Sequence, residues 1–238
     1  MQLYFIRHAQ SANNRLYEET GSWGGRDSDP ELTELGYEQA QRLAEHAACA
    51  NGGTPRRDYV NRSGFGFTHV YSSPMVRALA TGSYLAAALN LLLVVWEDLH
   101  EVGGIFVTDD ETGEYIGQPG KSRSELAARF PQAQLPETLG EEGWWNRAHE
   151  PVELQVKRAR RFVFDLLVQH GGSDDRVAVV SHGGFYNFVL AELLGTQAEN
   201  GFWFGLNNTG ITRFNFDPEG IGLAYANRLE HLPAELIT

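Results

Sequence analysis

The sequence is almost free of cysteine: Cys49 is the single cysteine among 238 residues. One cysteine can form neither an intrachain disulfide nor a cysteine-based zinc cluster, so nothing in the composition indicates an oxidising compartment. The simplest interpretation of Cys49 is a buried thiol on a helix.

Positive charge is also scarce, because 19 Lys and Arg residues face 31 Asp and Glu residues and leave a formal net charge of -12. Binding to nucleic acid and docking on anionic lipid both need an excess of cations, so we expect neither nucleic acid nor a membrane as a partner. Any anionic ligand of this chain has to be held by a few cations gathered in one place.

Long apolar runs are missing as well. No segment approaches the roughly 20 apolar residues that a membrane-spanning helix needs, and no basic N-terminal region leads into an apolar run. We therefore expect a cytoplasmic protein. Hydrophobic residues still make up 42% of the chain, enough for a sizeable core, and we predict a single domain over residues 1–238.

Short apolar runs alternate with amphipathic segments along the chain. This pattern predicts buried strands at 3–6, 68–71, 91–95 and 177–180, and helices at 33–50, 74–89, 152–170 and 183–194. Thr33 is the expected N-cap of the first helix, and Ser72-Ser73-Pro74 is expected to begin the second with proline at its first position. Two late strands, at 211–216 and 223–225, flank a turn. Strands alternating with helices imply an α/β fold, a three-layer α/β/α sandwich around a mostly parallel sheet.

Residues 103–151 interrupt this alternation. They are rich in glycine, proline and charge, with one short helical piece at 124–130. We interpret them as an insertion over the edge of the sheet where ligands bind.

Polar residues follow three of the expected parallel strands. Arg7-His8 ends the first strand, Arg77 follows the second, and His182-Gly183 follows the strand at 177–180. Ligands of parallel sheets collect beyond the carboxyl ends of the strands, so these side chains should converge.

Two arginines and two histidines in one cleft suit a small dianion such as a phosphate monoester. The planar arginine fork meets two phosphate oxygens at once and stays charged at physiological pH. The backbone N–H groups at the start of the helix after Gly183 add further donors. A neutral imidazole can attack phosphorus and form a covalent phosphohistidine, which water then hydrolyses.

Metal binding and a serine nucleophile are the competing interpretations. The arginines would repel a metal ion, and no His-x-x-x-His spacing or bracketing carboxylate pair is present, so we expect no metal at this site. Ser181-His182-Gly183-Gly184 lacks the G-x-S-x-G pattern of a serine nucleophile turn.

The leaving oxygen also needs a proton. Glu101 lies just past the third strand, where burial and an approaching phosphate could keep its carboxyl protonated. Glu97 and Asp98 are close enough in sequence to take the same role.

Each residue alone has a plainer explanation: Arg7 as a strand-end ion pair, His8 and His182 as satisfied polar residues, Arg77 as a solvated helix residue. All four residues are predicted to lie at the same edge of the sheet, and four independent structural roles at one edge are a poor explanation for this arrangement. The other histidines lack such company, and we interpret them as structural or surface residues: His46, His69, His100, His149, His170 and His231.

Several strings of the sequence resemble one known family. Phe5-Ile6-Arg7-His8-Ala9-Gln10-Ser11, with Asn14 shortly after, resembles the Arg-His-Gly signature of the histidine phosphatase superfamily, which includes the cofactor-dependent phosphoglycerate mutases. Further matches follow in order: Leu32-Thr33-Glu34-Leu35-Gly36, Tyr71-Ser72-Ser73-Pro74 with Arg77, Val180-Ser181-His182-Gly183-Gly184, and Asn208-Thr209-Gly210-Ile211-Thr212. The resemblance extends from residue 3 to about residue 216.

The resemblance implies roles for eight residues. His8 would be the phosphorylated nucleophile and Glu101 the acid, with His182 as the third catalytic residue. Phosphate would be bound by Arg7, Asn14, Arg77 and the Gly183 backbone, with Ser11 at the mouth of the site. Ala9 departs from the family's glycine, which would matter at a position of positive φ. The resemblance implies no metal and no organic cofactor.

Three activities remain open on this fold. A mutase needs extra cations for a substrate carboxylate, and the Glu-Arg-x-Tyr-Gly pattern of mutases is absent after Glu101, although Lys121 and Arg123 form a loose substitute. We therefore favour a histidine acid phosphatase-type hydrolase of small phosphorylated metabolites over a mutase or a regulatory binding protein with a weak site.

Three details of this hypothesis stay open. Trp144 and Trp145 either line an apolar wall of the substrate site or pack the insertion onto the core. Arg56, Arg57 and Arg62 either recruit a second anionic group or form a solvated basic turn. The oligomeric state is open too, a homodimer included.

Overall fold

The computed structural model describes residues 1–49, 58–109, 111–197 and 202–238. Its central sheet has seven strands in the order β6-β3-β2-β7-β1-β8-β9. The strands are β1 (Gln2–Arg7), β2 (His69–Ser72), β3 (Leu93–Val95), β6 (Ala133–Gln134), β7 (Arg176–Ser181), β8 (Ile211–Asp217) and β9 (Gly220–Arg228). The first five in this order run parallel, whereas β8 runs antiparallel to both β1 and β9. The predicted mostly parallel sheet is confirmed.

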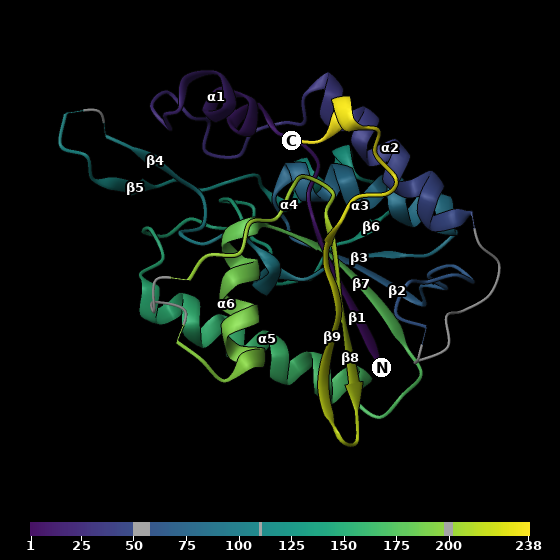
Figure 1. Ribbon diagram of the computed structural model, residues 1–238. Helices are drawn as coiled ribbons and strands as arrows, with labels where there is room; N and C mark the ends of the chain where they lie inside the picture. Colours follow the sequence, from purple (N-terminus) through teal and green to yellow (C-terminus); the bar gives the residue numbers. More distant parts are fainter. Residues whose placement is uncertain (50–57, 110, 198–201) are drawn as a thin grey trace.

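Helices cover both faces of this sheet. Figure 1 shows α2 (Glu34–Ala48) and α3 (Val76–Leu89) on one face and α5 (Val152–His170) and α6 (Gly183–Leu194) on the other. The alternation of side chains along a strand explains both layers. Tyr4 and Ile6 of β1 are buried in the cluster with α2 and α3, and Leu3 and Phe5 are buried in the cluster with α5 and α6. Each such burial contributes about 1.5–3 kcal/mol of hydrophobic stabilisation.

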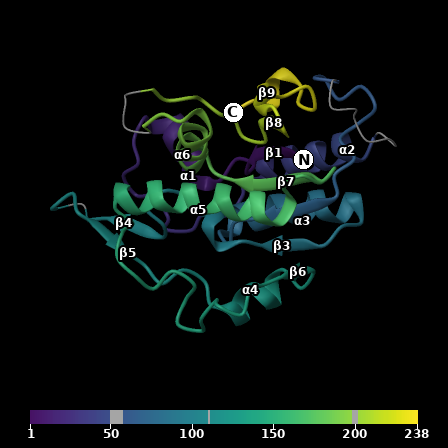
Figure 2. The same ribbon diagram turned by 90° about the horizontal axis from the view of Figure 1, so that it is seen from below.

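The segment after β3 contains more regular structure than the sequence predicts. It carries the hairpin β4 (Phe106–Thr108) and β5 (Tyr115–Gly117), the helix α4 (Arg123–Arg129) and β6, which pairs with β3. Figure 2 shows α4 and β6 beyond β3 at the edge of the sheet. The short 3-10 helices are η1 (Glu97–Leu99) and η2 (Ala234–Leu236).

The first helix, α1 (Ala12–Thr20), is absent from the sequence-based prediction. Its sequence has no apolar periodicity, and only Asn13 is buried. Ser11 caps its start through a capping box with Asn14, and Gly21 ends it in the left-handed conformation at φ 68°. Hydrogen bonds at both ends therefore define this helix where an apolar face does not.

Two local predictions were wrong. Helix α3 begins at Val76 with Met75 as its N-cap, so Pro74 lies before the helix and not at its first position. Cys49 follows α2 as its C-cap and is exposed, so it is not a buried thiol. Within the described residues, none of the helices combines the length and apolar character needed to cross a membrane.

Candidate active site

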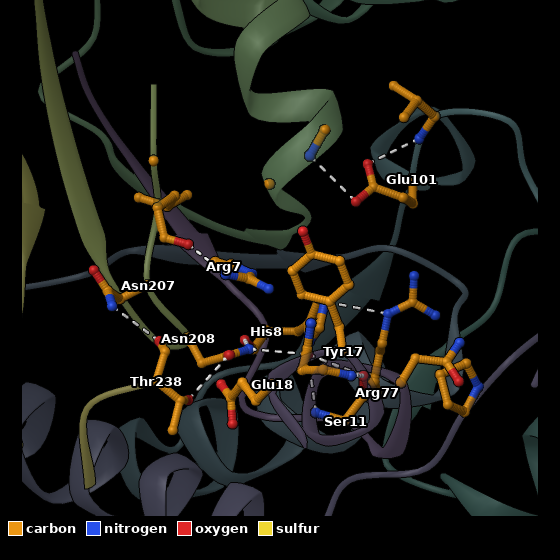
Figure 3. Close-up of a pocket in the computed structure, with 18 of the residues that line it drawn as sticks. Arg7, His8, Ser11, Tyr17, Glu18, Arg77, Glu101, Asn207, Asn208 and Thr238 are labelled. Carbon is orange, nitrogen blue, oxygen red and sulfur yellow. Dashed lines mark hydrogen bonds between the residues drawn. The ribbon is translucent and has the colours of Figure 1, made fainter. Parts of the chain in front are cut away.

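A cavity of about 690 Å³ opens beyond the carboxyl ends of the parallel strands. Seven of the eight residues to which we assigned roles from the sequence line it: Arg7, His8, Ser11, Asn14, Arg77, Glu101 and Gly183. Figure 3 shows Arg7, His8, Arg77 and Glu101 around this cavity, with Tyr17 and Glu18 of α1 on another side. The predicted convergence of the three strand ends is therefore observed.

His8 lies at the bottom of the cavity with only 3% of its surface exposed. Its Nδ1 is 2.7 Å from the carbonyl oxygen of Ala9, and its Nε2 accepts a hydrogen bond of 3.2 Å from Nε of Arg77. An arginine N–H can only donate, so Nε2 carries a lone pair and Nδ1 carries the proton. This is the tautomer in which Nε2 is free to act as a nucleophile.

Charge and burial keep His8 neutral. Burial lowers the pKa of His8 well below 6.5, and the neighbouring positive charges of Arg77 and Arg7 lower it further. A protonated imidazole has no lone pair to offer, so a low pKa preserves the nucleophile at neutral and mildly acidic pH.

Arg77 is held by an acid that the sequence analysis missed. Asp29 lies before α2, is buried, and accepts a hydrogen bond of 3.1 Å from the N–H of Val76 at the start of α3. Its Oδ1 also lies 3.5 Å from Nη1 of Arg77. Asp29 therefore caps α3 and fixes Arg77 at once. Burial raises the pKa of Asp29 to about 7, although Arg77 opposes this shift.

His182 lies next to His8 but does not line the cavity surface. The two ring centroids are 5.0 Å apart. Nε2 of His182 lies 2.9 Å from Oγ of Ser73, at the end of β2. Burial lowers the pKa of His182 well below 6.5, and the charge of Arg77 adds to this.

Several buried donors around His8 lack a hydrogen-bond acceptor among the described residues. They are Nε of Arg7, Nη1 of Arg77, which lies 3.5 Å from Oδ1 of Asp29, and Nδ1 of His182 in the tautomer whose Nε2 accepts from Ser73. Leaving a buried donor unpaired costs about 1–3 kcal/mol, and proteins rarely tolerate it without a reason. Three such donors around one imidazole can together receive an anion with several oxygens.

Glu101 is held at the start of α6. Oε1 accepts hydrogen bonds of 2.9 Å from the N–H groups of Val102 and Phe185, and Oε2 accepts one of 3.2 Å from Gly184. Figure 3 shows this carboxyl group beside α6. Glu101 is half-buried and lines the cavity, so it can reach a ligand there. The preceding acids Glu97 and Asp98 face other residues, since Asp98 pairs with Arg161 and Glu97 bonds Thr138.

Ser11 and Asn14 serve first as the cap of α1. Oδ1 of Asn14 accepts hydrogen bonds from the backbone N–H and the hydroxyl of Ser11, at 3.0 and 2.9 Å. Nδ2 of Asn208 donates to the same oxygen at 3.3 Å and to the carbonyl of His8 at 2.8 Å. Because its oxygen is occupied, Asn14 offers only its amide N–H groups to a ligand. Ala9 is not among the residues with positive φ, so its departure from glycine causes no backbone strain.

Arg26 is a further cation of the cavity that the sequence analysis missed. It follows α1 in the glycine-containing segment 21–30, lines the cavity, and stacks on Phe106 of β4. The sequence signal that could have identified Arg26 as a ligand-binding residue was an arginine next to glycines in an acidic chain.

The insertion contributes less to the cavity than the sequence suggested. Trp144 and Trp145 are buried in the hydrophobic cluster with α2 and α3, so they pack the insertion onto the core. Neither Lys121 nor Arg123 is among the described residues that line the cavity, and Lys121 pairs with Glu125 on α4. Arg62 is exposed, and Arg56 and Arg57 lie outside the described residues.

Among the described residues, one group could hold a metal ion: His69, His170 and Asp175, whose ligand atoms lie within 4.8 Å of one another. It lies at the opposite end of the sheet, where β2 and β7 begin. Nδ1 of His170 is 2.9 Å from Asp175, and its Nε2 is 3.0 Å from the Tyr71 hydroxyl. These hydrogen bonds account for the cluster without an ion. Like His69 and His170, the other histidines outside the predicted site are not among the described residues that line the cavity: His46, His100, His149 and His231.

The sequence matches one protein family over nearly its whole length. The model of the histidine phosphatase superfamily (branch 1) matches residues 3–228. The chain is 30% identical over 230 residues to a protein of Hydrogenobacter thermophilus with the provisional name phosphoserine phosphatase 2, and the match covers 97% of each chain.

More distant relatives include a mutase by name. The chain is 24% identical over 221 residues to a provisionally named phosphoglycerate mutase of Proteus mirabilis, a match that covers 91% of this chain and 85% of the relative. Among solved structures, a mutant phosphoserine phosphatase of Entamoeba histolytica in complex with phosphoserine is similar with a TM-score of 0.61 and 22% identity, covering 98% and 99% of the two chains. At this identity the likeness is one of fold.

Proposed function

Because the chain belongs to the histidine phosphatase superfamily, we propose that it is a phosphatase that hydrolyses small phosphate monoesters through a phosphohistidine on His8. One observation carries the proposal: the buried side chains of Arg7, Arg77 and His182 surround a neutral imidazole whose Nε2 accepts a hydrogen bond from Arg77, and Nε of Arg7 has no acceptor among the described residues. A phosphoryl group placed there satisfies these donors and meets a nucleophile at the same time.

In the first step Nε2 of His8 attacks phosphorus, and the bond from phosphorus to the ester oxygen breaks. Arg7, Arg77 and His182 stabilise the equatorial oxygens, the N–H of Gly183 at the start of α6 adds a donor, and Asn14 offers its amide. Glu101 gives a proton to the leaving oxygen. A monoanionic phosphate monoester can bring this proton, since the second pKa of such esters is about 6.

In the second step Glu101, now ionised, takes a proton from water. The resulting hydroxide attacks phosphorus, the bond to Nε2 breaks, and inorganic phosphate leaves with His8 neutral again. The cycle needs no further reactant. Ser11 keeps Asn14 oriented at the mouth of the cavity through the capping box.

Turnover of p-nitrophenyl phosphate by the wild type and by His8→Ala tests the nucleophile. We expect His8→Ala to lose activity, whereas equal rates for the two proteins would refute His8 as the nucleophile. Rapidly quenched wild type should also carry a phosphate label that is lost in acid and survives in base. A label that resists acid would indicate a serine ester instead.

A mutase is the second candidate, favoured by the relatedness to the Proteus mirabilis protein. Both activities share the phosphohistidine and differ in whether water or a second hydroxyl receives the phosphoryl group. Incubation with 3-phosphoglycerate and 2,3-bisphosphoglycerate separates them: we expect free phosphate, and isomerised phosphoglycerate would show a mutase.

A further inference from the structure

The Arg26 guanidinium lies in the cavity without a counter-ion. Its Cζ is 4.3 Å from the centroid of Phe106 and 5.9 Å from that of Trp23. Its Nε is buried and has no hydrogen-bond partner among the described residues, and no ion pair with a described carboxylate is recorded for it. Arg26 is therefore held by stacking, which leaves the N–H edge of the fork available.

The surroundings of Arg26 make this isolation costly. Burial lowers the pKa of Arg26, and the positive charge of Arg77 lowers it further, while the carboxylates of Glu101 and Asp27 act in the opposite direction. A partly desolvated cation close to a second cation is unfavourable unless a negative group joins them. The proposed phosphate site pairs Arg7 and Arg77 with one phosphoryl group, and Arg26 remains as a third cation of the cavity, whose lining also holds the acids Glu18 and Glu101.

The size of the cavity agrees with a ligand that is larger than phosphate. Its volume of about 690 Å³ falls in the range of small-molecule sites. The uncharged amides of Asn13, Asn207 and Asn227 also line it, and they are hydrogen-bonded to other residues of the protein.

We infer that Arg26 binds a carboxylate carried by the substrate, at a distance from the phosphate that Arg7 and Arg77 hold. This inference rests on the proposed function, because the carboxylate has to arrive on the same phosphate monoester. A carboxylate fits better than a second phosphate because Arg26 supplies one positive charge, which balances the single negative charge of a carboxylate and not the charge of a phosphate dianion. The planar fork can donate two hydrogen bonds to that carboxylate.

Arg26 also bridges two segments, since its own loop follows α1 and Phe106 belongs to β4. A purely structural role would make Arg26 important for every ligand alike. A role in carboxylate binding would affect only ligands that carry the carboxylate. The two roles therefore predict different outcomes for a matched pair of ligands.

The pair is 3-phosphoglycerate and glycerol 3-phosphate, which differ by a carboxylate in place of a hydroxymethyl group. Binding is measured by calorimetry in the His8→Ala variant, so that no turnover occurs. We expect 3-phosphoglycerate to bind about 10- to 100-fold more tightly, the range for a hydrogen-bonded charged group. Adding Arg26→Gln should abolish this preference and leave the affinity for glycerol 3-phosphate near its starting value, and Arg26→Lys should restore part of the preference.

Arg123→Gln serves as the control, because it removes an arginine of the insertion that does not line the cavity. Three outcomes would overturn the inference. The two ligands could bind equally well before any change at Arg26, the preference could survive Arg26→Gln, or neither ligand could bind. An equal loss of affinity for both ligands on Arg26→Gln would assign Arg26 a structural role. Absence of p-nitrophenyl phosphate turnover with the preference intact would instead refute the proposed function alone.

Discussion

Nε of Arg77 donates a hydrogen bond of 3.2 Å to Nε2 of His8, the imidazole nitrogen that faces the cavity. One guanidinium thus fixes the tautomer of His8, lowers the pKa of that imidazole, and lies where it can donate hydrogen bonds to phosphate oxygens. When a phosphoryl group enters, the guanidinium can transfer its hydrogen bonds to the phosphate oxygens while Nε2 bonds to phosphorus. The ground-state contact therefore holds both partners close to their reactive positions.

Replacing Arg77 should damage catalysis more than folding. We expect Arg77→Gln to lower kcat/KM for p-nitrophenyl phosphate by about 10²- to 10³-fold, the usual cost of one preorganised donor to a charged transition state. Arg77→Lys should recover only part of this loss, because an ammonium group lacks the planar fork. The matched control is Arg42→Gln on the exposed face of α2, which should keep wild-type kinetics. Full activity in Arg77→Lys would show that charge alone suffices.

The imidazole of His8 should stay neutral in mildly acidic solution. Because burial and the two arginines lower its pKa well below 6.5, the free enzyme keeps its nucleophile at neutral and mildly acidic pH. An acid-phosphatase profile follows, in which kcat/KM is maintained or rises as the pH falls toward 5 and the monoanionic ester becomes available. Nitrogen-detected NMR should show His8 protonated at Nδ1 alone at pH 5.5, with the signal assigned by its loss in His8→Asn. A cationic His8 at that pH would contradict the prediction.

Asp29 should make the folded state less stable as the pH rises. Its carboxyl has a pKa of about 7 in the folded protein, above the ordinary value of 3.8. Between these two values the folded state holds a proton that the unfolded state has released, so the stability contributed by this proton is present below pH 4 and lost as the pH rises toward 7. Asp29→Asn removes the titration and keeps an oxygen for the Val76 N–H.

Urea unfolding at pH 5 and pH 8 checks this sign. The free energy of unfolding of Asp29→Asn, relative to wild type, should be higher at pH 8 than at pH 5, by at most about 1.4 kcal/mol for each pH unit inside the window. Asp174→Asn, which removes an exposed carboxylate, should show the same difference in the free energy of unfolding between pH 5 and pH 8 as the wild type. If Asp29→Asn shows the same difference between the two pH values as the wild type, Asp29 is ionised in the folded state and paired with Arg77.

The sheet and the convergence of its polar strand ends could be predicted because both depend on local sequence. A continuous apolar run such as Leu3–Ile6 indicates a strand buried on both faces, and parallel strands place their carboxyl ends at one edge. Arg7, His8, Arg77 and Gly183 therefore came together from position in the chain alone. The resemblance to a family added Ser11 and Asn14 and favoured Glu101 over Glu97 and Asp98.

The parts that could not be predicted depend on contacts between distant segments. Asp29 completes the start of α3 by accepting the Val76 N–H, so neither Ser73 nor Pro74 marks the first turn. Arg26 faces the cavity because its loop passes over Phe106, which lies far along the chain. The apolar character of Trp144 and Trp145 likewise indicated that both would be in apolar contacts. It could not indicate whether they line the cavity or pack on the core, as the structure shows they do.

The role of Glu101 as proton donor predicts a dependence on the leaving group. An alkyl alkoxide is a poor leaving group and needs a proton in the transition state, whereas p-nitrophenolate leaves without one. We therefore expect Glu101→Gln to slow formation of the phosphohistidine from an alkyl phosphate by about 10²- to 10⁴-fold and from p-nitrophenyl phosphate by about 10-fold or less. Single-turnover measurements isolate this step from the later attack of water. Glu97→Gln is the matched control, because Glu97 bonds Thr138 and does not line the described cavity. Equal losses for the two substrates would show that Glu101 positions α6 and the phosphate and does not donate the proton.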